Sequence, residues 1–417
     1  MLPLILLPIF FGDTASVVVA GIVVIIMFKL ILRFIRETRM QSINSSIATQ
    51  SEAAPMSYSM SNHTKIEIEP IERFINNILK EKPVRFTPQN ILDFTQNYAM
   101  KLGSGGYGVV YKGQFPNGIQ VAVKVLNKTS GEKAEEQFMA EVGIMSRTYH
   151  INLVKLYGFC FDKSVKALVY EYMEKGSLDK YLYSQAQALE WEKLHVIATG
   201  TAKGIRYLHE ECEQKIVHYD IKPANVLLTA ELFPKAADFG LACLCDRKVS
   251  HGTPTGVRGT PGFAAPEMWT SVLPNKNEKC DVYSFGMLLF EILGRRKNLD
   301  FKQDNESREW FPQWVWNKFE QGEMESIISL CGVESKDRAK AERMCQVALW
   351  CIQYQPDARP SMTGVVRMLE GEQEIVPPVN PFYYISSTEA DSKMVSTTDS
   401  SSSFNVKDNC ETYSQSG

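Results

Sequence analysis

The stretch His218 to Asn225, H-Y-D-I-K-P-A-N, constrains the fold and chemistry of this chain more than any other. It lies between an apolar helical run and a short apolar strand. Asp220 supplies a carboxylate that can orient and deprotonate a hydroxyl, Lys222 a cation for a migrating phosphate, and Asn225 an oxygen suited to Mg²⁺. An isolated D-x-K-x-x-N is more often a polar turn whose Asp and Asn bond the nearby backbone. The motifs on either side of this stretch favour the chemical interpretation.

Four further motifs accompany this loop, and they come in one order along the chain. They are G-S-G-G-Y-G-V-V at Gly103–Val110, V-A-V-K ending at Lys124, D-F-G at Asp238–Gly240 and A-P-E at Ala265–Glu267. Together with the loop, they resemble the signature set of the eukaryotic protein kinases. These motifs are the ones that define the family, so a match to them marks a resemblance to it.

The resemblance extends from Thr95 to Gly371 and includes every catalytic motif of the family. Within kinases, Trp310–Trp314 and Val347–Gly371 resemble plant receptor-like kinases of the leaf-rust-resistance type. The resemblance implies an α+β, two-lobed protein kinase fold, with a small β-rich N-lobe that carries one regulatory helix and a large, mostly α-helical C-lobe. We expect this kinase domain to occupy residues 95–371.

Length and composition agree with a mostly globular protein and argue against some other functions. At 417 residues, the chain has room for one two-lobed domain plus extra segments. A formal net charge of -3 gives no support for a protein that binds nucleic acid by neutralising its phosphates. The nine cysteines have irregular spacing, which predicts reduced thiols and no zinc site.

The N-terminal region predicts a single transmembrane helix at Ala15–Leu32. Only Lys29 interrupts this apolar run, which covers ~27 Å of the ~30 Å hydrocarbon core of a bilayer. Three arginines follow at once, namely Arg33, Arg36 and Arg39. By the positive-inside rule, they place the C-terminal side in the cytosol. A cleaved secretory signal is disfavoured because no basic residue precedes the first apolar run at Leu2–Phe11. We therefore expect a single-pass protein of the plasma membrane with a cytosolic kinase domain.

Residues 1–14 would then form the whole extracytosolic part, which is far shorter than the ~40 residues below which domains rarely fold alone. The resembling family normally carries a cysteine-rich ectodomain. We therefore expect the protein to act with a co-receptor or an ectodomain-bearing partner, unless the sequence is truncated.

Two further segments flank the predicted kinase domain. The juxtamembrane segment, residues 33–94, contains a flexible linker and then an amphipathic helix whose apolar face we expect to pack, most conservatively, on the kinase itself. That face comprises Ile71, Phe74, Ile75, Ile78 and Leu79. Thr87 and Pro88 predict the start of a second helix. Residues 372–417 are rich in Ser and Thr and predict a disordered tail with candidate phosphoacceptors.

The glycine motif predicts a strand, a tight turn and a second strand that cover nucleotide phosphates. Strand-like residues follow Gly108, which argues against a dinucleotide-binding turn because that turn needs a helix there. The resemblance implies that ATP contacts Leu102, Gly103, Ser104, Gly105, Gly106, Tyr107, Gly108, Val110, Ala122 and Lys124, and from other segments Glu171, Met173 and Leu227.

Lys124 ends the apolar strand predicted at Gln120–Val123, and the resemblance makes it the contact to the α- and β-phosphates. This lysine needs an anion, which the helix predicted at Glu132–Ser146 can supply. Glu141 lies three residues after the apolar Phe138 and therefore joins the buried face of that helix. Two other acidic residues, Glu135 and Glu136, point more toward water. We therefore pair Glu141 with Lys124.

The remaining nucleotide contacts fall in the hinge and after the catalytic loop. By resemblance, the backbone from Glu171 to Met173 binds adenine and Tyr170 is the gatekeeper at the back of the pocket, although it could equally be a core aromatic. Short strands at Val226–Leu228 and Lys235–Ala237 bring Asp238 beside Asn225. These two side chains are the predicted ligands for Mg²⁺, with Mn²⁺ as an alternative ion.

Phosphoryl transfer depends mainly on alignment and charge neutralisation. The resemblance assigns Asp220 as the catalytic base, and the lysine two residues later matches the serine/threonine-kinase pattern. Thr260 resembles the threonine that ties the substrate-binding segment to Asp220 and Lys222. Asp281 and Arg359 resemble buried structural residues that hold the catalytic loop and Glu267.

One residue departs from the pattern of the family. Tyr219 stands where an arginine usually precedes the catalytic aspartate, and a tyrosine cannot pair with a phosphate on the activation loop. We hypothesise that activity does not depend on a phosphate docking at position 219. Loss of transfer when Ser250, Thr253 and Thr255 are all changed to alanine would contradict this hypothesis.

The favoured reading is a membrane-anchored serine/threonine protein kinase that uses ATP and magnesium, acts on protein substrates and does not bind nucleic acid. A catalytically weak pseudokinase that serves as a scaffold in a receptor complex is the alternative. Tyr219 and the short extracytosolic part favour it, whereas the presence of Lys124, Glu141, Asp220 and the two metal ligands disfavours it. A third interpretation is a soluble kinase whose N-terminal apolar region is a leader and not a transmembrane helix.

Overall fold

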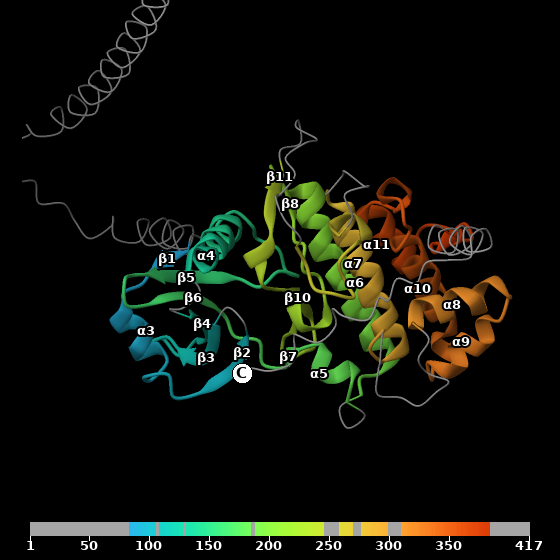
Figure 1. The fold of residues 1–417 in the computed structure, drawn as a ribbon. Helices are drawn as coiled ribbons and strands as arrows, with labels where there is room; N and C mark the ends of the chain where they lie inside the picture. Colours follow the sequence, from blue (N-terminus) through green and yellow to red (C-terminus); the bar gives the residue numbers. More distant parts are fainter. Residues whose placement is uncertain are drawn as a thin grey trace, which may run out of the picture. The chain divides into compact units, whose positions relative to one another are not determined.

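Six strands form the sheet of the N-lobe in the computed structural model (Figure 1). The structure describes residues 83–105, 108–127, 131–184, 188–245, 258–269, 277–298 and 310–383. The strands are β1 Val84–Arg85, β2 Lys101–Gly105, β3 Gly108–Gln114, β4 Gln120–Leu126, β5 Leu156–Phe161 and β6 Lys166–Glu171, in the order β1-β5-β6-β4-β3-β2. Neighbouring strands are antiparallel, except that β1 runs parallel to β5.

Strand β4 shows how the alternation of residues along a strand decides which face of the sheet each side chain occupies. Val121 and Val123 are completely buried on one face, and Lys124 lies on the other because successive side chains of a strand point to opposite faces. The strand was predicted to end at Lys124, and this is wrong, since it continues to Leu126. The reason is that the alternation persists: Leu126 is buried on the same face as Lys124, in the core that contains Phe138.

Two helices pack on this sheet. Helix α3, Pro88–Phe94, begins where Thr87 and Pro88 predicted, and Thr87 and Asn90 cap it reciprocally at 3.0 and 3.2 Å. Its Ile91 is completely buried in the core of the sheet, so residues before the predicted boundary at Thr95 belong to the packed lobe. Helix α4, Gly131–Met145, lies close to the predicted Glu132–Ser146, and Phe138 packs on the rings of two β5 phenylalanines.

The C-lobe is built mainly from helices. They are α5 Asp179–Leu182, α6 Trp191–Arg206, α7 Lys279–Gly294, α8 Phe311–Glu320, α9 Met324–Leu330, α10 Arg338–Cys351 and α11 Met362–Glu370. Helix α7 is buried on every side from Cys280 to Leu293, and Figure 1 shows it among the other helices of the lobe. Such an apolar helix needs neighbours all round it, which makes α7 the centre of the C-lobe core.

Helix α6 presents the apolar stripe that its sequence predicts. All six residues of the stripe are buried, namely Leu194, Ile197, Ala198, Thr201, Ile205 and Leu208. The helix itself ends at Arg206, and a π-helical turn at Tyr207–Glu211 carries Leu208. The prediction that this stripe is core and not chemistry is confirmed.

Short strands frame the catalytic loop. Strand β8, Lys215–Val217, precedes the loop and pairs with β11, Cys243–Cys245. Strand β9, Val226–Leu228, follows the loop and pairs with both β10, Pro234–Ala236, and β7, Gly176–Ser177. The loop is therefore fixed at both ends by backbone hydrogen bonds.

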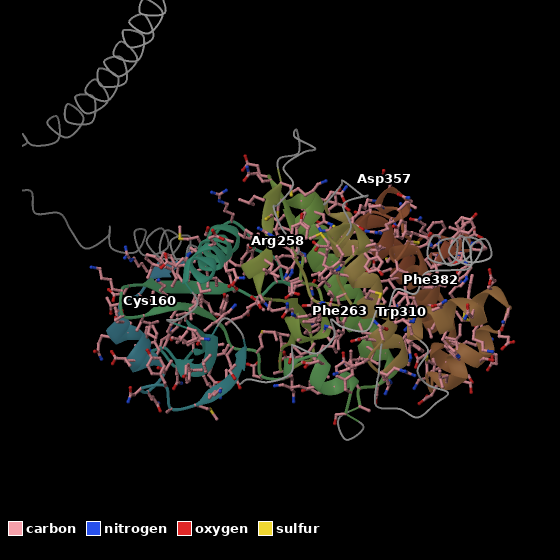
Figure 2. All side chains as sticks on the ribbon, viewed as in Figure 1. Cys160, Arg258, Phe263, Trp310, Asp357 and Phe382 are labelled. Carbon is pink, nitrogen blue, oxygen red and sulfur yellow. The ribbon has the colours of Figure 1, made fainter. Side chains whose placement is uncertain are left out.

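Several predicted segments lie outside the described residues. These are the transmembrane helix at 15–32, the amphipathic face between Ile71 and Leu79, and the tail from 384 onward. Among the helices that the structure does describe, none has the length and apolar character that a membrane span requires. The first part of the predicted tail is packed: the ring of Phe382 lies 5.2 Å from that of Trp310, and Figure 2 shows the two residues together.

A buried ion pair joins two distant parts of the C-lobe. Arg359 donates from Nη1 and Nη2 to the two carboxylate oxygens of Glu267 at 2.5 and 2.9 Å, and both side chains are fully buried. Arg359 also donates to the carbonyl oxygens of Gln353, Lys279 and Tyr354. The predicted structural role of both residues is therefore confirmed.

Replacing Arg359 with methionine should lower the free energy of unfolding by about 3 to 5 kcal/mol, because Glu267 would remain as a buried and unpaired charge. Urea denaturation followed by circular dichroism measures this change. The matched control is Arg338→Met, which removes an exposed arginine whose ion pairs with Glu325 and Glu342 lie at the surface. Equal effects of the two substitutions would contradict the role of the buried pair.

Candidate active site

Lys124 connects three separate segments of the chain. Its Nζ lies 3.2 Å from Glu141 Oε2 of α4 and 2.8 Å from Asp238 Oδ1, which follows β10. Burial alone would lower the pKa of the Lys124 ammonium, but the two carboxylates outweigh burial and hold that pKa above its usual value. The lysine is therefore charged at physiological pH. The structure contains the predicted pair with Glu141 and adds a second partner, Asp238.

Glu141 is held from a second side by the predicted gatekeeper. The Tyr170 hydroxyl donates to Glu141 Oε1, while Oε2 accepts from Lys124. Burial and the neighbouring Glu141 carboxylate raise the pKa of Tyr170 well above its ordinary value, so the hydroxyl remains a donor. Glu135 lies on the exposed side of α4, as predicted, and pairs with Lys166 instead.

Three polar side chains, two from the catalytic loop and one from the activation segment, surround the carboxylate of Asp220. Asp220 Oδ1 accepts from the hydroxyl of Thr260 at 2.6 Å, and Oδ2 accepts from Lys222 Nζ at 2.8 Å and from Asn225 Nδ2 at 2.9 Å. Lys222 Nζ also donates to the Thr260 hydroxyl oxygen at 2.8 Å. The structure thus brings together the base, cation and threonine that the sequence predicted. Asp220 is only 7% exposed, so its orientation is fixed by these donors.

The backbone of the loop is held by a buried carboxylate. Asp281 of α7 accepts from the backbone N–H groups of His218 and Tyr219 at 2.7 Å each, and its Oδ2 lies 2.8 Å from His209 Nε2. Tyr219 has a φ of 62°, a left-handed conformation that costs free energy for a residue with a side chain. Because Asp281 accepts from the N–H of Tyr219 and from that of the preceding residue, it stabilises the unusual turn. The predicted role of Asp281 is confirmed.

Asp238 connects the residues around Lys124 with those around Asp220. It adopts a left-handed φ of 66° at the start of the 3₁₀ turn Phe239–Leu241. The preceding residue, Ala237, donates its N–H to the carbonyl oxygen of Asn225 at 2.9 Å. This bond joins the segment that carries Asp238 to the catalytic loop that carries Asp220. Burial would raise the pKa of Asp238, but Lys124 outweighs it and lowers that pKa below the ordinary value.

The oxygen atoms of Asn225 and Asp238 suit a magnesium ion. Asn225 Nδ2 donates to the carbonyl oxygen and to Oδ2 of Asp220, which leaves Oδ1 as the atom that can bind a cation. No cluster of three or more His, Cys, Asp or Glu side chains in the described part of the chain could hold a metal ion by itself. Mg²⁺ is usually held by one or two protein ligands together with substrate phosphates, and this donor set fits that pattern.

The predicted nucleotide-binding residues occupy neighbouring positions on the sheet. In the β2–β3 hairpin Gly103, Ser104 and Gly105 face Val110, Val109 and Gly108, whereas Gly106 and Tyr107 lie outside the described residues. On the next strands Val110 faces Lys124 and Ala122 faces Tyr170. Leu102 is partly exposed at 38%, and Leu227 lies in the centre of β9. These contacts with nucleotide remain predictions.

The hinge has a feature that the sequence did not predict. The Glu171 carboxylate turns away from the backbone of the hinge and accepts from Lys235 Nζ at 2.9 Å and from the N–H of Lys155 at 2.6 Å. Met173 is buried, and its carbonyl oxygen accepts from Gly176 at 3.1 Å. The side chain of Glu171 thus ties the end of β6 to β10 and to the backbone at Lys155.

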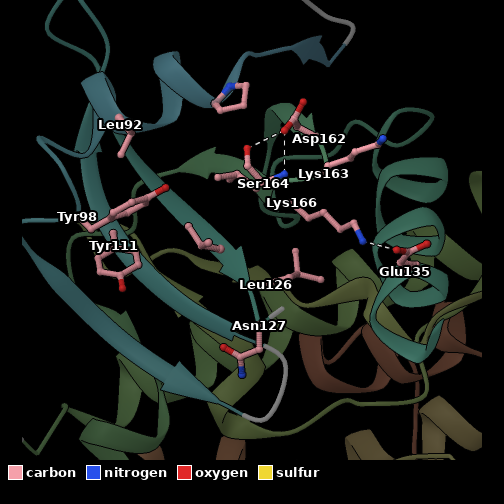
Figure 3. A pocket seen from close by; sticks show the side chains of 13 residues that line it. Leu92, Tyr98, Tyr111, Leu126, Asn127, Glu135, Asp162, Lys163, Ser164 and Lys166 are labelled. Carbon is pink, nitrogen blue, oxygen red and sulfur yellow. Dashed lines mark hydrogen bonds and ion pairs between the residues drawn. The ribbon is translucent and has the colours of Figure 1, made fainter. Parts of the chain in front are cut away.

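A cavity of about 580 Å³ lies on the N-lobe (Figure 3). Aromatic and apolar side chains line one part of it, including Leu92, Tyr98 and Tyr111. Lys166 and Glu135 pair in another part, as Figure 3 shows. No residue predicted for catalysis or nucleotide binding lines this cavity, so it is not assigned to the reaction.

The family model described as protein tyrosine and serine/threonine kinase matches residues 97–369 of the chain. The chain belongs to the protein kinase family. The match covers most of the chain and includes every group of the site described above.

Plant receptor kinases are among the similar proteins. Rust resistance kinase Lr10 of Triticum aestivum is 41% identical over 331 residues, which are 78% of this chain and 51% of that protein. PR5-like receptor kinase of Arabidopsis thaliana is 40% identical over 327 residues, 77% of this chain and 49% of that protein. The G-type lectin S-receptor-like serine/threonine-protein kinase SD2-5 of Arabidopsis thaliana is 42% identical over 312 residues, 74% of this chain and 37% of that protein. The chain spans about half the length of the first two.

Sequence reasoning missed several contacts of this kinase site. It did not pair Lys124 with Asp238, and it gave no role to the Glu171 side chain. The residue types carry no signal of these contacts, because Lys124 and Asp238 are separated by 114 positions and meet only after the two lobes have formed. The spacing along α4 was sufficient for Glu141 because that choice depended on one helix face.

Replacing Glu141 with glutamine should lower kcat/KM for ATP-dependent transfer about 10- to 100-fold, since Lys124 would lose one of its two charged partners. Glu135→Gln on the exposed side of the same helix should leave the rate unchanged. Steady-state kinetics with varied ATP measures both variants. Equal rates for the two variants would show that Glu141 does not hold Lys124 for the reaction.

Proposed function

We propose that this chain is a membrane-anchored serine/threonine protein kinase that transfers the γ-phosphate of ATP to hydroxyl groups of proteins. The arrangement of Lys222, Thr260 and Asn225 around the two oxygens of Asp220 is the observation that carries this proposal. Three donors fix the direction of a carboxylate that is almost completely buried. This geometry suits a group that must receive a proton from one defined direction.

In the proposed reaction, Asp220 accepts the proton of the substrate hydroxyl as its oxygen attacks the γ-phosphorus. The bond from that phosphorus to the bridging oxygen of ADP breaks in the same transfer. Lys222 lies 2.8 Å from Asp220 and supplies positive charge beside the transferred group. Lys124, held by Glu141 and Asp238, would bind the α- and β-phosphates and thereby orient the leaving group.

Asn225 and Asp238 are the residues that would hold magnesium. The ion, when bound, supplies charge neutralisation for the phosphate oxygens. The hydrogen bond from Ala237 N–H to the Asn225 carbonyl oxygen keeps the two ligands on adjacent backbone segments. Their amide and carboxylate oxygens are the ligand types that Mg²⁺ and Mn²⁺ accept.

Serine and threonine are the proposed acceptors. Support comes from Lys222 and from its contact with Thr260, which match the pattern of kinases acting on these residues. The SD2-5 relative is itself named a serine/threonine-protein kinase.

We also propose that Ala15–Leu32 anchors the kinase in the plasma membrane with its catalytic domain in the cytosol. The apolar run and the arginines after it support this proposal, as do the receptor kinases among the relatives.

The membrane proposal predicts that the full-length chain stays in the membrane pellet after extraction with alkaline carbonate. A variant with Ile25 and Ile26 replaced by aspartate should move to the supernatant, because charges at the centre of a span are costly. Release of the unaltered chain by carbonate would contradict a transmembrane anchor.

The catalytic proposal predicts that Asp220→Asn lowers kcat about 10²- to 10⁴-fold, the range expected of a positioned general base. Chelation of divalent ions should abolish transfer and added Mg²⁺ should restore it. Radiolabelled ATP with a generic protein substrate measures both effects, and phosphoamino-acid analysis identifies the acceptor. The matched control is Asp357→Asn, an exposed aspartate of the C-lobe. Absence of metal-dependent transfer by the unaltered chain would overturn the proposal and favour a scaffold.

A further inference from the structure

The side chain that precedes the catalytic aspartate carries no charge in this protein. Tyr219 is 3% exposed. Burial raises the pKa of its hydroxyl far above the ordinary value, and the neighbouring Cys280 and Cys245 act in the same direction. The side chain is therefore neutral at physiological pH. A phosphate on the activation segment, residues 238–267, would find no cation at this position.

Arg258 supplies a cation from within the activation segment. Its Nη1 donates to the carbonyl oxygen of Leu241 at 3.0 Å and to Cys243 Sγ at 2.7 Å. Figure 2 shows Arg258 alongside the strand β11, which begins at Cys243. Cys243 in turn pairs with Val217 of β8, the strand that leads into the catalytic loop. One guanidinium thus fastens the later part of the segment to the strand next to the loop.

The two residues after Arg258 contact the catalytic loop directly. Gly259 has a φ of 104°, and a Cβ atom added there would lie 3.0 Å from the carbonyl oxygen of Tyr219. Glycine therefore permits a close approach of two backbones. Thr260 then donates to Asp220 at 2.6 Å and accepts from Lys222 at 2.8 Å. Three consecutive residues contact β11, the backbone of the loop and its catalytic side chains in turn.

We propose that Arg258 is a positioning residue that holds the activation segment in register with the catalytic loop and makes a loop phosphate unnecessary for that purpose. Arg258 acts through Thr260. Its guanidinium holds the backbone at position 258, and the short link through Gly259 then keeps the Thr260 hydroxyl on Asp220. The kinetic part of this inference rests on the proposed kinase function. Its structural part does not, and the two parts are tested separately.

The kinetic test compares phosphatase-treated variants of the full chain. Arg258→Gln should lower kcat about 10- to 100-fold with little change in the KM for ATP, because Arg258 bonds Leu241 and Cys243 within its own segment. Arg258→Lys should restore only part of kcat, since lysine keeps the charge but lacks the outer nitrogen, Nη1, that donates both bonds. The matched control is Arg147→Gln, an exposed arginine that bonds Gln214 at 3.3 Å. Wild-type kcat in Arg258→Gln would overturn the proposal.

A second kinetic comparison addresses the phosphate. Alanine at Ser250, Thr253 and Thr255 together should leave kcat unchanged, and Arg258→Gln should have the same effect with or without these alanines. A large loss of kcat from the three alanines alone, or from phosphatase treatment of the wild type, would show that a phosphate orders the segment and would overturn the proposal.

Hydrogen exchange tests the structural part without any catalysis. The amides of Phe263 and Ala264 donate to the carbonyl oxygen of Thr260 at 3.0 Å each. In the unphosphorylated chain these amides should be protected from exchange, and Arg258→Gln should raise their exchange rate at least about 10-fold while the amides of α7 stay unchanged. Unchanged exchange of the Phe263 and Ala264 amides in Arg258→Gln would contradict the inference. Faster exchange with no transfer activity in the wild type would instead contradict only the proposed function.

Discussion

The ion pairs of Lys124 are the interaction on which the rest of the site depends. One ammonium lies between the carboxylates of Glu141 and Asp238, and these three residues come from β4, from α4 and from the segment after β10. In a partly buried position, loss of the Lys124 ammonium would leave both carboxylates without compensation, so this one side chain holds the three segments together. Strand β4 makes this possible because its alternation buries Val121 and Val123 on one face and directs Lys124 to the other. The same alternation therefore builds the core of the N-lobe and directs Lys124 toward Glu141 and Asp238.

The catalytic loop has a corresponding support in Asp281. This carboxylate lies on the most deeply buried helix of the C-lobe and accepts from the N–H groups of His218 and Tyr219. A buried carboxylate needs donors, and the loop needs acceptors for the turn at Tyr219 with its positive φ, so each satisfies the other. The result is a rigid backbone from which Asp220 and Asn225 project. Preorganisation of this kind matters most for phosphoryl transfer, where alignment and charge dominate.

The activation segment is connected to this rigid frame by residues of its own. Tyr219 fills its position with a neutral, buried side chain, while Arg258 bonds Leu241 and Cys243 within the same segment. A phosphate and its arginine order such a segment only after modification, whereas an arginine that bonds a carbonyl and a thiol is always charged and always available. The two arrangements differ in regulation, because the first needs a covalent modification and the second does not.

The sequence by itself determined most of what depends on local spacing. The cap at Thr87, the apolar stripe of α6, the buried face of α4 that selected Glu141 and the order of the kinase motifs all follow from rules that operate within one element or one motif. Only the tertiary structure decided the pairing of Lys124 with Asp238, the turn of the Glu171 side chain toward Lys235 and the contacts of Arg258. Each of these contacts joins residues from different elements, so its partner depends on how the lobes and the activation segment pack against each other. No periodicity within the chain records that packing.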